Sequence, residues 1–470
     1  MTTTAPRAAA APPRDDRLDP ALIKIGIVLV LGTIIAVLDS TVVNVGIEAI
    51  RRDFGSPLST IQWISTGYLL AFALVAPMSG WATERFGAKR MWMASVAGFV
   101  LASALCGLAW SAPSLVAFRI LQGAAGGLIQ PIGQSMLAQA AGRERIGRVM
   151  GMLIIPLTFA PALGPVIGGI LISAASWPWI FYLNLPLGAL TLLLAARILP
   201  DAVGQPGQKL DVRGLLLISP GLAALIYGLS ETANGGGLTA PRVLVATIAG
   251  LALLAGYTAH ALKHTGSPLV DLRLFAVPSF RNAVASSFML GAALFSSMFL
   301  LPLYYQVVRG QSPLHTGLLT LPQDFGIALS MFFVGRLTDK LGPRWFIVAG
   351  VLLAMAGTFV YTRVGSHPSE YLLGLGLFVR GVGMGAAMSP IMAAVFRSVQ
   401  PQQMPQAAGT TNVLHRIGGS LGTALLAVVL EHQSGSHAPA QAFAATFWWA
   451  FALSALTLLP ALMLPGRNRG

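Results

Sequence analysis

The chain alternates between long apolar runs and short polar segments over almost its whole length. A helix needs about 20 apolar residues to cross the ~30 Å hydrocarbon core of a bilayer, and runs of that length recur here. They predict fourteen transmembrane helices, at 23–47, 60–81, 90–110, 113–138, 147–174, 178–199, 213–232, 241–262, 282–307, 315–336, 344–364, 370–396, 404–430 and 441–464. The pattern therefore indicates an all-α membrane protein.

Composition agrees with this fold class. Hydrophobic residues make up 55% of the chain and charged residues 10%, which is typical of a membrane protein and not of a soluble core. Residues 1–20 are rich in alanine, proline and charge and show no cleavage site, so we expect a disordered cytoplasmic tail and a retained first span. The single cysteine excludes an intrachain disulfide and a cysteine-based metal site.

Basic residues define the expected topology. The predicted outer loops contain only Arg51, Arg52, Arg242, Arg309 and Arg363, whereas most of the 30 lysines and arginines fall in the tail and in the loops of the opposite side. The positive-inside rule then places both termini in the cytoplasm and the protein in the cell membrane. The net charge of +14 is dispersed over these loops, so it does not indicate nucleic-acid binding.

An internal repeat divides the chain. The loop "GWATERFGAKRM" after the second span matches "GRLTDKLGPRWF" after the tenth. This predicts two six-helix bundles, 21–200 and 266–470, around two inserted spans within 201–265, as in many alternating-access carriers. Each loop is either a plain topogenic turn or a latch, in which glycines let helix ends approach and an acidic side chain bonds nearby basic groups or helix ends. The expected latch residues are Gly80, Glu84, Arg85, Gly87, Arg90, Gly335, Asp339, Lys340 and Gly342.

Two charged residues lie at similar depths in the first bundle. At 1.5 Å per residue, Asp39 falls about 12 Å and Arg119 about 10 Å from the outer ends of their antiparallel spans, so the side chains could pair or share water. Desolvation favours the neutral form of a carboxylate and a nearby guanidinium favours the charged form, so alternating exposure would let Asp39 take up and release protons. The alternative is a static ion pair or a hydrogen bond from these side chains to the backbone at a helix end.

Three more ionisable residues lie inside predicted spans. Asp324, about 14 Å into the tenth span, would bind a cationic substrate, carry a second proton or pair with Arg380. Arg416 is expected to form a structural or gating network with Asn412. Close helix approach and a bend in the fifth span are expected from Gly164, Pro165, Gly168 and Gly169. An apolar, adaptable pocket wall is expected from Trp63, Tyr68, Tyr304, Tyr305, Gln306, Met289 and Met298.

Several longer stretches carry a resemblance to a known family. They are "LDSTVVNVGI" (38–47), "QWISTGYLLAFA" (62–73), "RILQGAAGG" (119–127), "GPVIGG" (164–169), "WPWIFYLNLPLG" (177–188), "LPLYYQVVRGQSPLHTGLLTLP" (301–322) and "NVLHRIGGSLG" (412–422). The chain resembles the major facilitator superfamily, and more closely its fourteen-span drug:proton antiporters. The resemblance implies that Asp39 and Arg119 serve proton coupling and that the fifth span carries the antiporter motif. Two departures are Ala160, where that motif usually has a glycine, and Asp324, where many relatives have a small or apolar residue.

These observations predict a transporter without a cofactor. No Walker loop, dinucleotide fingerprint or nucleophile elbow occurs, and the histidines show no metal-ligand spacing. We expect a proton-coupled antiporter that exports amphipathic, cationic or aromatic drugs or metabolites, with lipid as its surroundings and a monomer as its simplest state. Export or flipping of a lipid or of a self-produced metabolite fits the same residues. A multi-pass lipid-modifying enzyme would need a catalytic cluster at one membrane face, and a non-transporting sensor would not need coupling residues.

Overall fold

The computed structural model describes residues 19–142, 145–201, 204, 207, 210–231, 240–263, 269–270, 272–311, 313–363, 369–435 and 437–465, and the predicted tail lies outside this part except for its last two residues. The first bundle contains α1 (Pro20–Phe54), α2 (Leu58–Val75), the 3₁₀ turn η1 (Ala76–Met78), α3 (Ser79–Phe86), α4 (Ala88–Gly107), α5 (Ala112–Ala141), α6 (Ile146–Ala174), α7 (Trp179–Tyr182) and α8 (Asn184–Ile198).

The inserted pair and the second bundle follow in chain order. The pair consists of α9 (Val212–Glu231) and α10 (Pro241–Lys263). The second bundle contains η3 (Leu272–Ala276), α11 (Pro278–Val307), α12 (Pro313–Leu341), α13 (Pro343–Thr362), α14 (Glu370–Arg397), η4 (Pro401–Gln403), α15 (Met404–Ser434), α16 (Pro439–Leu456) and α17 (Leu458–Leu462).

Every predicted span coincides with one of these helices or with a consecutive helix pair, which confirms the all-helical class. Within the described residues, 12 helical segments are long and apolar enough to cross a membrane. The two predicted spans outside that set are α6, in which the side chains of residues 151–162 lie outside the described part, and α9, whose apolar portion is the shorter Val212–Leu225. The fold is therefore a helical membrane protein, and the count of fourteen spans stays a prediction.

The two repeated loops have the same backbone geometry. Gly87 separates α3 from α4 with φ 85°, and Gly342 separates α12 from α13 with φ 88°. In each case the glycine N–H donates to a threonine carbonyl four residues earlier, Thr83 at 2.9 Å and Thr338 at 3.0 Å. Positive φ strongly favours glycine, so the sequence repeat reflects one turn used twice.

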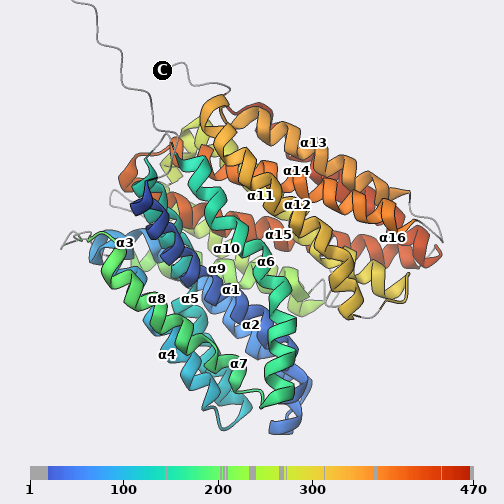
Figure 1. Ribbon diagram of the computed structural model, residues 1–470, viewed down its shortest axis with the longest axis horizontal. Helices are drawn as coiled ribbons and strands as arrows, with labels where there is room; N and C mark the ends of the chain where they lie inside the picture. The colour runs from blue at the N-terminus through green and yellow to red at the C-terminus, as the bar shows by residue number, and fades with distance from the viewer. Residues whose placement is uncertain are drawn as a thin grey trace, which may run out of the picture.

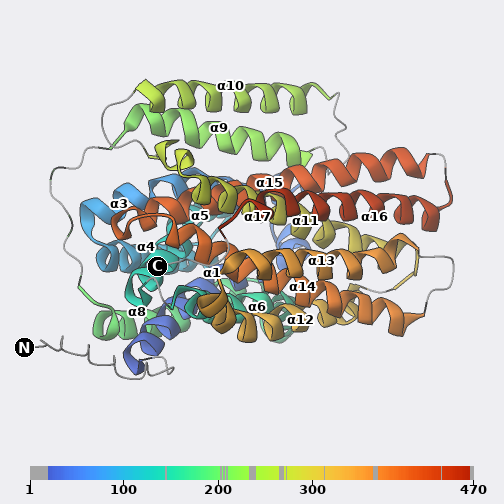
Figure 2. The ribbon, with the colours of Figure 1, turned by 90° about the horizontal axis from the view of Figure 1, so that it is seen from above.

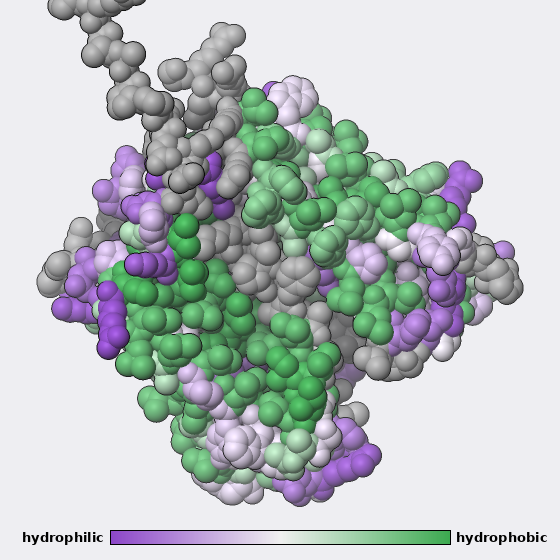
Figure 3. All heavy atoms as spheres, in the orientation of Figure 1, coloured by the Kyte–Doolittle hydropathy of each residue, from purple (hydrophilic) through white to green (hydrophobic). Residues whose placement is uncertain are grey.

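The two bundles form a V. In Figure 1, helices α1 to α8 extend downward and α11 to α16 extend to the right from a shared end. We call this shared end, where α1 begins at Pro20 and α17 ends at Leu462, the terminus side. The helices diverge on the opposite side. Figure 3 shows apolar residues over the flanks of both arms and polar residues at their ends, as expected for a protein surrounded by lipid.

The inserted pair lies against one side of the V. Figure 2 shows α10 outermost, with α9 between it and the two bundles. Helix α9 contacts α2 of the first bundle and α15 of the second, whereas α10 packs mainly on α9. The hydroxyl of Ser219 on α9 donates to the Leu74 carbonyl of α2 at 2.5 Å. The pair thus covers the seam between the bundles along that face.

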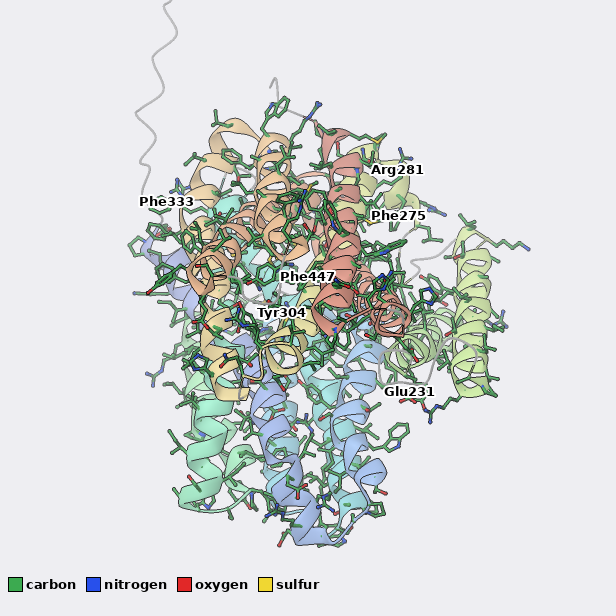
Figure 4. All side chains as sticks on the ribbon, turned by 90° about the vertical axis from the view of Figure 1, so that its right-hand side faces the viewer. Glu231, Phe275, Arg281, Tyr304, Phe333 and Phe447 are labelled. Carbon is green, nitrogen blue, oxygen red and sulfur yellow. The ribbon has the colours of Figure 1, made fainter. Side chains whose placement is uncertain are left out.

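Aromatic packing defines the core of the second bundle. Tyr304 of α11 and Phe447 of α16 point toward each other (Figure 4), with ring centroids 6.0 Å apart. Tyr305 of α11 meets Tyr361 of α13 through their hydroxyl groups at 2.9 Å. These contacts direct the aromatic end of α11 into its own bundle and away from the space between the bundles.

Candidate functional site: a buried ion pair beside a central cavity

Asp39 and Arg119 form a buried ion pair in the first bundle. The Arg119 Nη1 donates to Asp39 Oδ2 at 2.5 Å, and both side chains are almost wholly inaccessible. The depth estimate from sequence therefore placed the two groups correctly. A charged pair at this position needs its remaining hydrogen-bonding atoms satisfied, because desolvation of each ion costs several kcal/mol.

Neighbouring amides satisfy the pair. Gln122, one turn after Arg119 on α5, accepts from the guanidinium at 2.7 Å and donates to Asp39 Oδ1 at 2.9 Å. Asn184, at the start of α8, donates to the same Asp39 oxygen at 2.7 Å and to the Ser103 hydroxyl at 2.9 Å. The carboxylate thus accepts three donors from two helices besides its own. Sequence reasoning missed Gln122 and Asn184, although Gln122 lies three residues after Arg119, on the same helix face.

Tyr68 covers the guanidinium. The centre of the Arg119 guanidinium lies 4.1 Å from the centroid of the Tyr68 ring, and Arg119 Nε donates to the Ile64 carbonyl at 3.2 Å. A Cβ on Gly123 would lie 2.3 Å from the Tyr68 carbonyl oxygen, so α2 and α5 approach this closely only because residue 123 is glycine. Tyr68, which the sequence suggested as a substrate contact, instead packs on the ion pair.

The predicted motif of the fifth span packs on α1 just beyond Asp39. A Cβ on Gly164 would lie 2.1 Å from Thr41 Oγ1, and a Cβ on Gly168 would lie 3.2 Å from Val42 Cγ1. Gly169 faces open space, and the side chain of Pro165 lies outside the described residues. Helix α6 is therefore held against α1 within one turn of the carboxylate.

The second bundle has a related arginine with different partners. Arg380 of α14 is buried and donates to Thr358 Oγ1 at 3.1 Å, to Ser297 Oγ at 2.5 Å and to Gln323 Oε1. It also donates to the Ala293 carbonyl at 3.1 Å. These acceptors are neutral, so the pairing with Asp324 that the sequence left open is not formed. The two bundles share a buried arginine, but a carboxylate partner is present only beside Arg119 among the described residues.

A central cavity of about 310 Å³ lies between the bundles. Its wall includes Asp324 and Gln323 of α12, and Asp324 forms no ion pair or hydrogen bond within the described part of the chain. The first bundle contributes the following residues: Val37, Gln130 and Gln134. The second bundle also contributes Ser287, Leu290, Leu294, Met298, Ile327, Met388, Ile391, Met392, Thr411, Asn412, His415 and Arg416. This mixture of methionines, aliphatic side chains and a few polar groups is typical of an adaptable small-molecule site.

Most of the predicted pocket wall lies elsewhere. Trp63 is exposed and stacks on Tyr227 of α9, with ring centroids 6.4 Å apart. Tyr304 and Tyr305 are buried in the aromatic core of the second bundle, and Gln306 is exposed at the end of α11. Of the predicted lining residues, Asp324 and Met298 face the central cavity and Met289 does not. Whether a residue lines the cavity depends on the rotation of its helix about the helix axis, which residue type alone does not give.

The expected Asn412–Arg416 network takes a different form. Asn412 donates to Gln134 of the first bundle at 2.8 Å and to the Ala408 carbonyl at 3.0 Å. Arg416 stacks on Phe72 of α2, with 4.4 Å between the guanidinium carbon and the ring centroid. Both residues reach across the seam, but they do not hydrogen-bond to each other. The spacing of cavity residues 411, 412, 415 and 416 follows one face of α15, a signal that the sequence contained.

The first glycine of each repeated loop packs against the opposite bundle. A Cβ on Gly80 of α3 would lie 3.1 Å from Gln406 Cβ of α15. A Cβ on Gly335 of α12 would lie 2.8 Å from the Gly147 carbonyl oxygen of α6. The Ser389 hydroxyl of α14 donates to the same carbonyl at 2.9 Å. These contacts close the terminus side.

For the charged residues of the predicted latch, the structure describes no hydrogen bond or ion pair with the opposite bundle. Glu84 and Arg85 are half-buried and Arg90 is exposed, and the side chains of Asp339 and Lys340 lie outside the described residues. Neighbouring Lys89 pairs with Asp201 at 3.0 Å, within the first bundle. Among the described latch residues, Gly80 and Gly335 are the ones that contact the opposite bundle.

Comparison with known proteins identifies the architecture. The family model of the major facilitator superfamily matches residues 29–423 and 318–469. The chain belongs to the major facilitator superfamily. It is 40% identical over 420 residues to a multidrug resistance protein B homolog of Mycobacterium tuberculosis (strain ATCC 25618 / H37Rv), covering 89% of this chain and 78% of that protein. It is 29% identical over 410 residues to a tetracenomycin C resistance and export protein of Streptomyces glaucescens, covering 87% and 76%.

A solved transporter structure shares the fold. The crystal structure of the human organic anion transporter MFSD10 (TETRAN) superposes with a TM-score of 0.67 at 18% identity, covering 95% of this chain and 100% of that one. Membership of the major facilitator superfamily makes this chain a membrane transporter of small molecules and not an enzyme. The alternative of a lipid-modifying enzyme is thereby excluded.

Proposed function

We propose that this superfamily member is a proton-coupled antiporter of fourteen spans that exports amphipathic, cationic or aromatic compounds across the cell membrane. Both termini lie in the cytoplasm, as the distribution of arginine and lysine indicates. The relatives named for multidrug resistance and for antibiotic resistance and export support the direction of transport and the kind of substrate.

This orientation assigns the structure to an outward-facing state. The terminus side, where Gly80 and Gly335 contact the opposite bundle, is then the closed cytoplasmic side. The opposite side, on which the two bundles diverge (Figure 1), would then face the outside. Rocking of the bundles about the seam would break the glycine contacts and expose the same cavity to the cytoplasm, as alternating access requires.

The observation that carries the coupling proposal is the buried Asp39–Arg119 pair. A proton on Asp39 removes the negative charge, while Arg119 keeps its bonds to Gln122 and to the Ile64 carbonyl. The ion pair then no longer holds α1 against α5. Since protonation changes the free energy of one packing arrangement relative to another, it can bias the two states of the transporter.

A small cavity offers a path for that proton. A space of about 60 Å³, large enough for ordered water, is lined by Ser40 next to Asp39 and by Tyr68 over Arg119. Gln130 and Arg416 line both this space and the central cavity. Water in the small cavity would therefore join the substrate site to the surroundings of the ion pair.

Helix α6 would transmit the change between the bundles. Gly164 packs on Thr41, two residues after Asp39, and Gly147 near the start of α6 contacts Gly335 of the second bundle. A shift of α1 on protonation would thus reach the closed cytoplasmic contact through α6. This supports coupling through packed elements with two arrangements.

Transport by purified protein in liposomes tests the proposal. Ethidium movement against its gradient is followed by fluorescence with an imposed pH gradient and, in parallel, after nigericin has collapsed that gradient. We expect transport that depends on the pH gradient. Ethidium movement of the same rate and extent with and without the gradient would refute proton coupling.

A second candidate cargo is an antibiotic made by the cell itself. The name of the Streptomyces glaucescens relative, a tetracenomycin C resistance and export protein, favours antibiotic export, and lipid flipping would use the same alternating access. An efflux panel containing ethidium and a fluorescent phospholipid separates these uses: lipid transfer between leaflets without dye efflux would favour the lipid.

A further inference from the structure

Two opposite charges face the central cavity without a protein partner. Asp324 and Arg416 both line it, and within the described part of the chain neither forms an ion pair or a hydrogen bond. The other arginines inside the membrane are satisfied differently: Arg119 has a carboxylate and Arg380 has four neutral acceptors. Asp324 and Arg416 therefore stand apart from the ionic groups that hold the fold together.

The stacking of Arg416 leaves its donors available. The guanidinium carbon of Arg416 lies over the Phe72 ring, 4.4 Å from the ring centroid. A guanidinium has five N–H donors, and within the described residues those of Arg416 form no hydrogen bond. Their surroundings include the amides of Gln130 and Asn412 and the open volume of the cavity. A planar anion is the ligand that this edge binds best.

Helices α12 and α15 thus present a carboxylate and a guanidinium to one space of about 310 Å³. Ligand sites are commonly ~300–1,000 Å³, so this cavity suits a single compact molecule. A purely cationic ligand would pair with Asp324 but would strip water from Arg416 without replacing it, which costs free energy. A ligand that carries both charges would satisfy both groups at once.

We propose, on the basis of the export function above, that the preferred cargo is an amphipathic zwitterion. Its cationic group binds Asp324, its carboxylate or phenolate binds Arg416, and its apolar body packs on Leu294, Met298 and Met388. Arg416 is then the residue that distinguishes zwitterions from simple cations.

Two rhodamine dyes form a matched pair of probes. Rhodamine 110 carries a free carboxylate and a cationic ring system, and rhodamine 123 is its methyl ester and is only cationic. Binding to the purified full-length transporter is measured by fluorescence polarisation at neutral pH without a membrane gradient. We expect the free acid to bind at least ~10-fold more tightly than the ester, and Arg416→Gln to bring the two affinities together.

Control variants separate specificity from folding. Arg416→Lys keeps a cation and should retain part of the preference for the free acid. Arg363→Gln is a matched control, because Arg363 also lies over a phenylalanine ring, Phe359 at 5.4 Å, but outside the cavity; it should keep the full preference. Each variant is checked for monodisperse elution and for its melting temperature.

Each outcome decides between the claims. Equal affinity of the wild-type protein for both dyes, or an equal loss of both in Arg416→Gln with lysine giving no recovery, overturns the zwitterion assignment. Failure to bind either dye overturns the zwitterion assignment and the proposed export of amphipathic aromatic compounds together. Binding of both dyes with equal affinity leaves the proposed function standing.

Discussion

Replacing Asp39 with asparagine removes one negative charge from a buried cluster and keeps the shape of the side chain. Arg119 would lose its carboxylate partner at 2.5 Å, while Gln122 and Asn184 would still face an amide oxygen. Breaking a buried pair by removing one partner costs about 3–5 kcal/mol, and the remaining oxygen places the expected loss of unfolding free energy near ~3 kcal/mol. The variant should fold but lose its titratable group.

The pH gradient sets how much substrate a proton-coupled transporter can accumulate. A gradient of one pH unit supplies about 1.4 kcal/mol for each proton exchanged, enough for about tenfold accumulation of substrate. If Asp39 is the coupling site, Asp39→Asn should show no accumulation driven by the gradient, while exchange of labelled for unlabelled substrate continues, because that exchange needs no net proton movement.

The assay compares both activities in liposomes containing equal amounts of protein. Glu48→Gln is the matched control, since Glu48 lies on the same helix but is exposed and pairs with Arg51 at 2.8 Å; it should behave as wild type. Unimpaired gradient-driven accumulation by Asp39→Asn would refute the reasoning, and loss of exchange as well would reduce Asp39 to a structural role.

Three further substitutions test the helix contacts and the cavity. Gly164→Ala should lower gradient-driven transport at least ~10-fold, because its Cβ would lie 2.1 Å from Thr41 Oγ1, and Thr41→Ala in the same chain should recover part of it; no change in transport rate would contradict the packing argument. Gly335→Ala should weaken the closed side, because its Cβ would lie 2.8 Å from the Gly147 carbonyl. Labelling of a cysteine introduced on the closed side should then become faster from the cytoplasmic face, and an unchanged labelling rate would count against the latch. Asp324→Asn should weaken binding of cationic compounds ~10-fold or more and spare neutral ones, whereas an equal loss for both in a binding assay would indicate a structural role.

The sequence predicted the helices well, for a physical reason. A bilayer imposes a minimum apolar length, so each span leaves a long local signal, and the helical rise then fixes the depth of a residue within it. This is why the sequence places Asp39 and Arg119 at similar depths, where they could pair or share water. The repeated loop likewise predicted two related turns, because Gly87 and Gly342 must adopt positive φ.

Rotation of each helix about its axis was harder to predict. Tyr304 and Tyr305 were expected at the substrate site because aromatic rings suit drug binding, yet they pack inside the second bundle with Phe447. In a membrane protein both the lipid-facing and the core-facing sides of a helix are apolar, so hydrophobicity gives little phase information. His415 and Gln134 were also missed as cavity residues. Polar residues spaced three or four apart on α15 were the available signal.

Proton release on substrate binding tests the central claim most directly. Purified transporter in a weakly buffered solution, with a pH-sensitive dye, is mixed with a substrate whose binding is verified separately. The account predicts that the wild-type protein releases protons when substrate binds and that Asp39→Asn binds substrate without releasing them. Substrate binding to the wild-type protein without proton release, or equal release from Asp39→Asn, would contradict it.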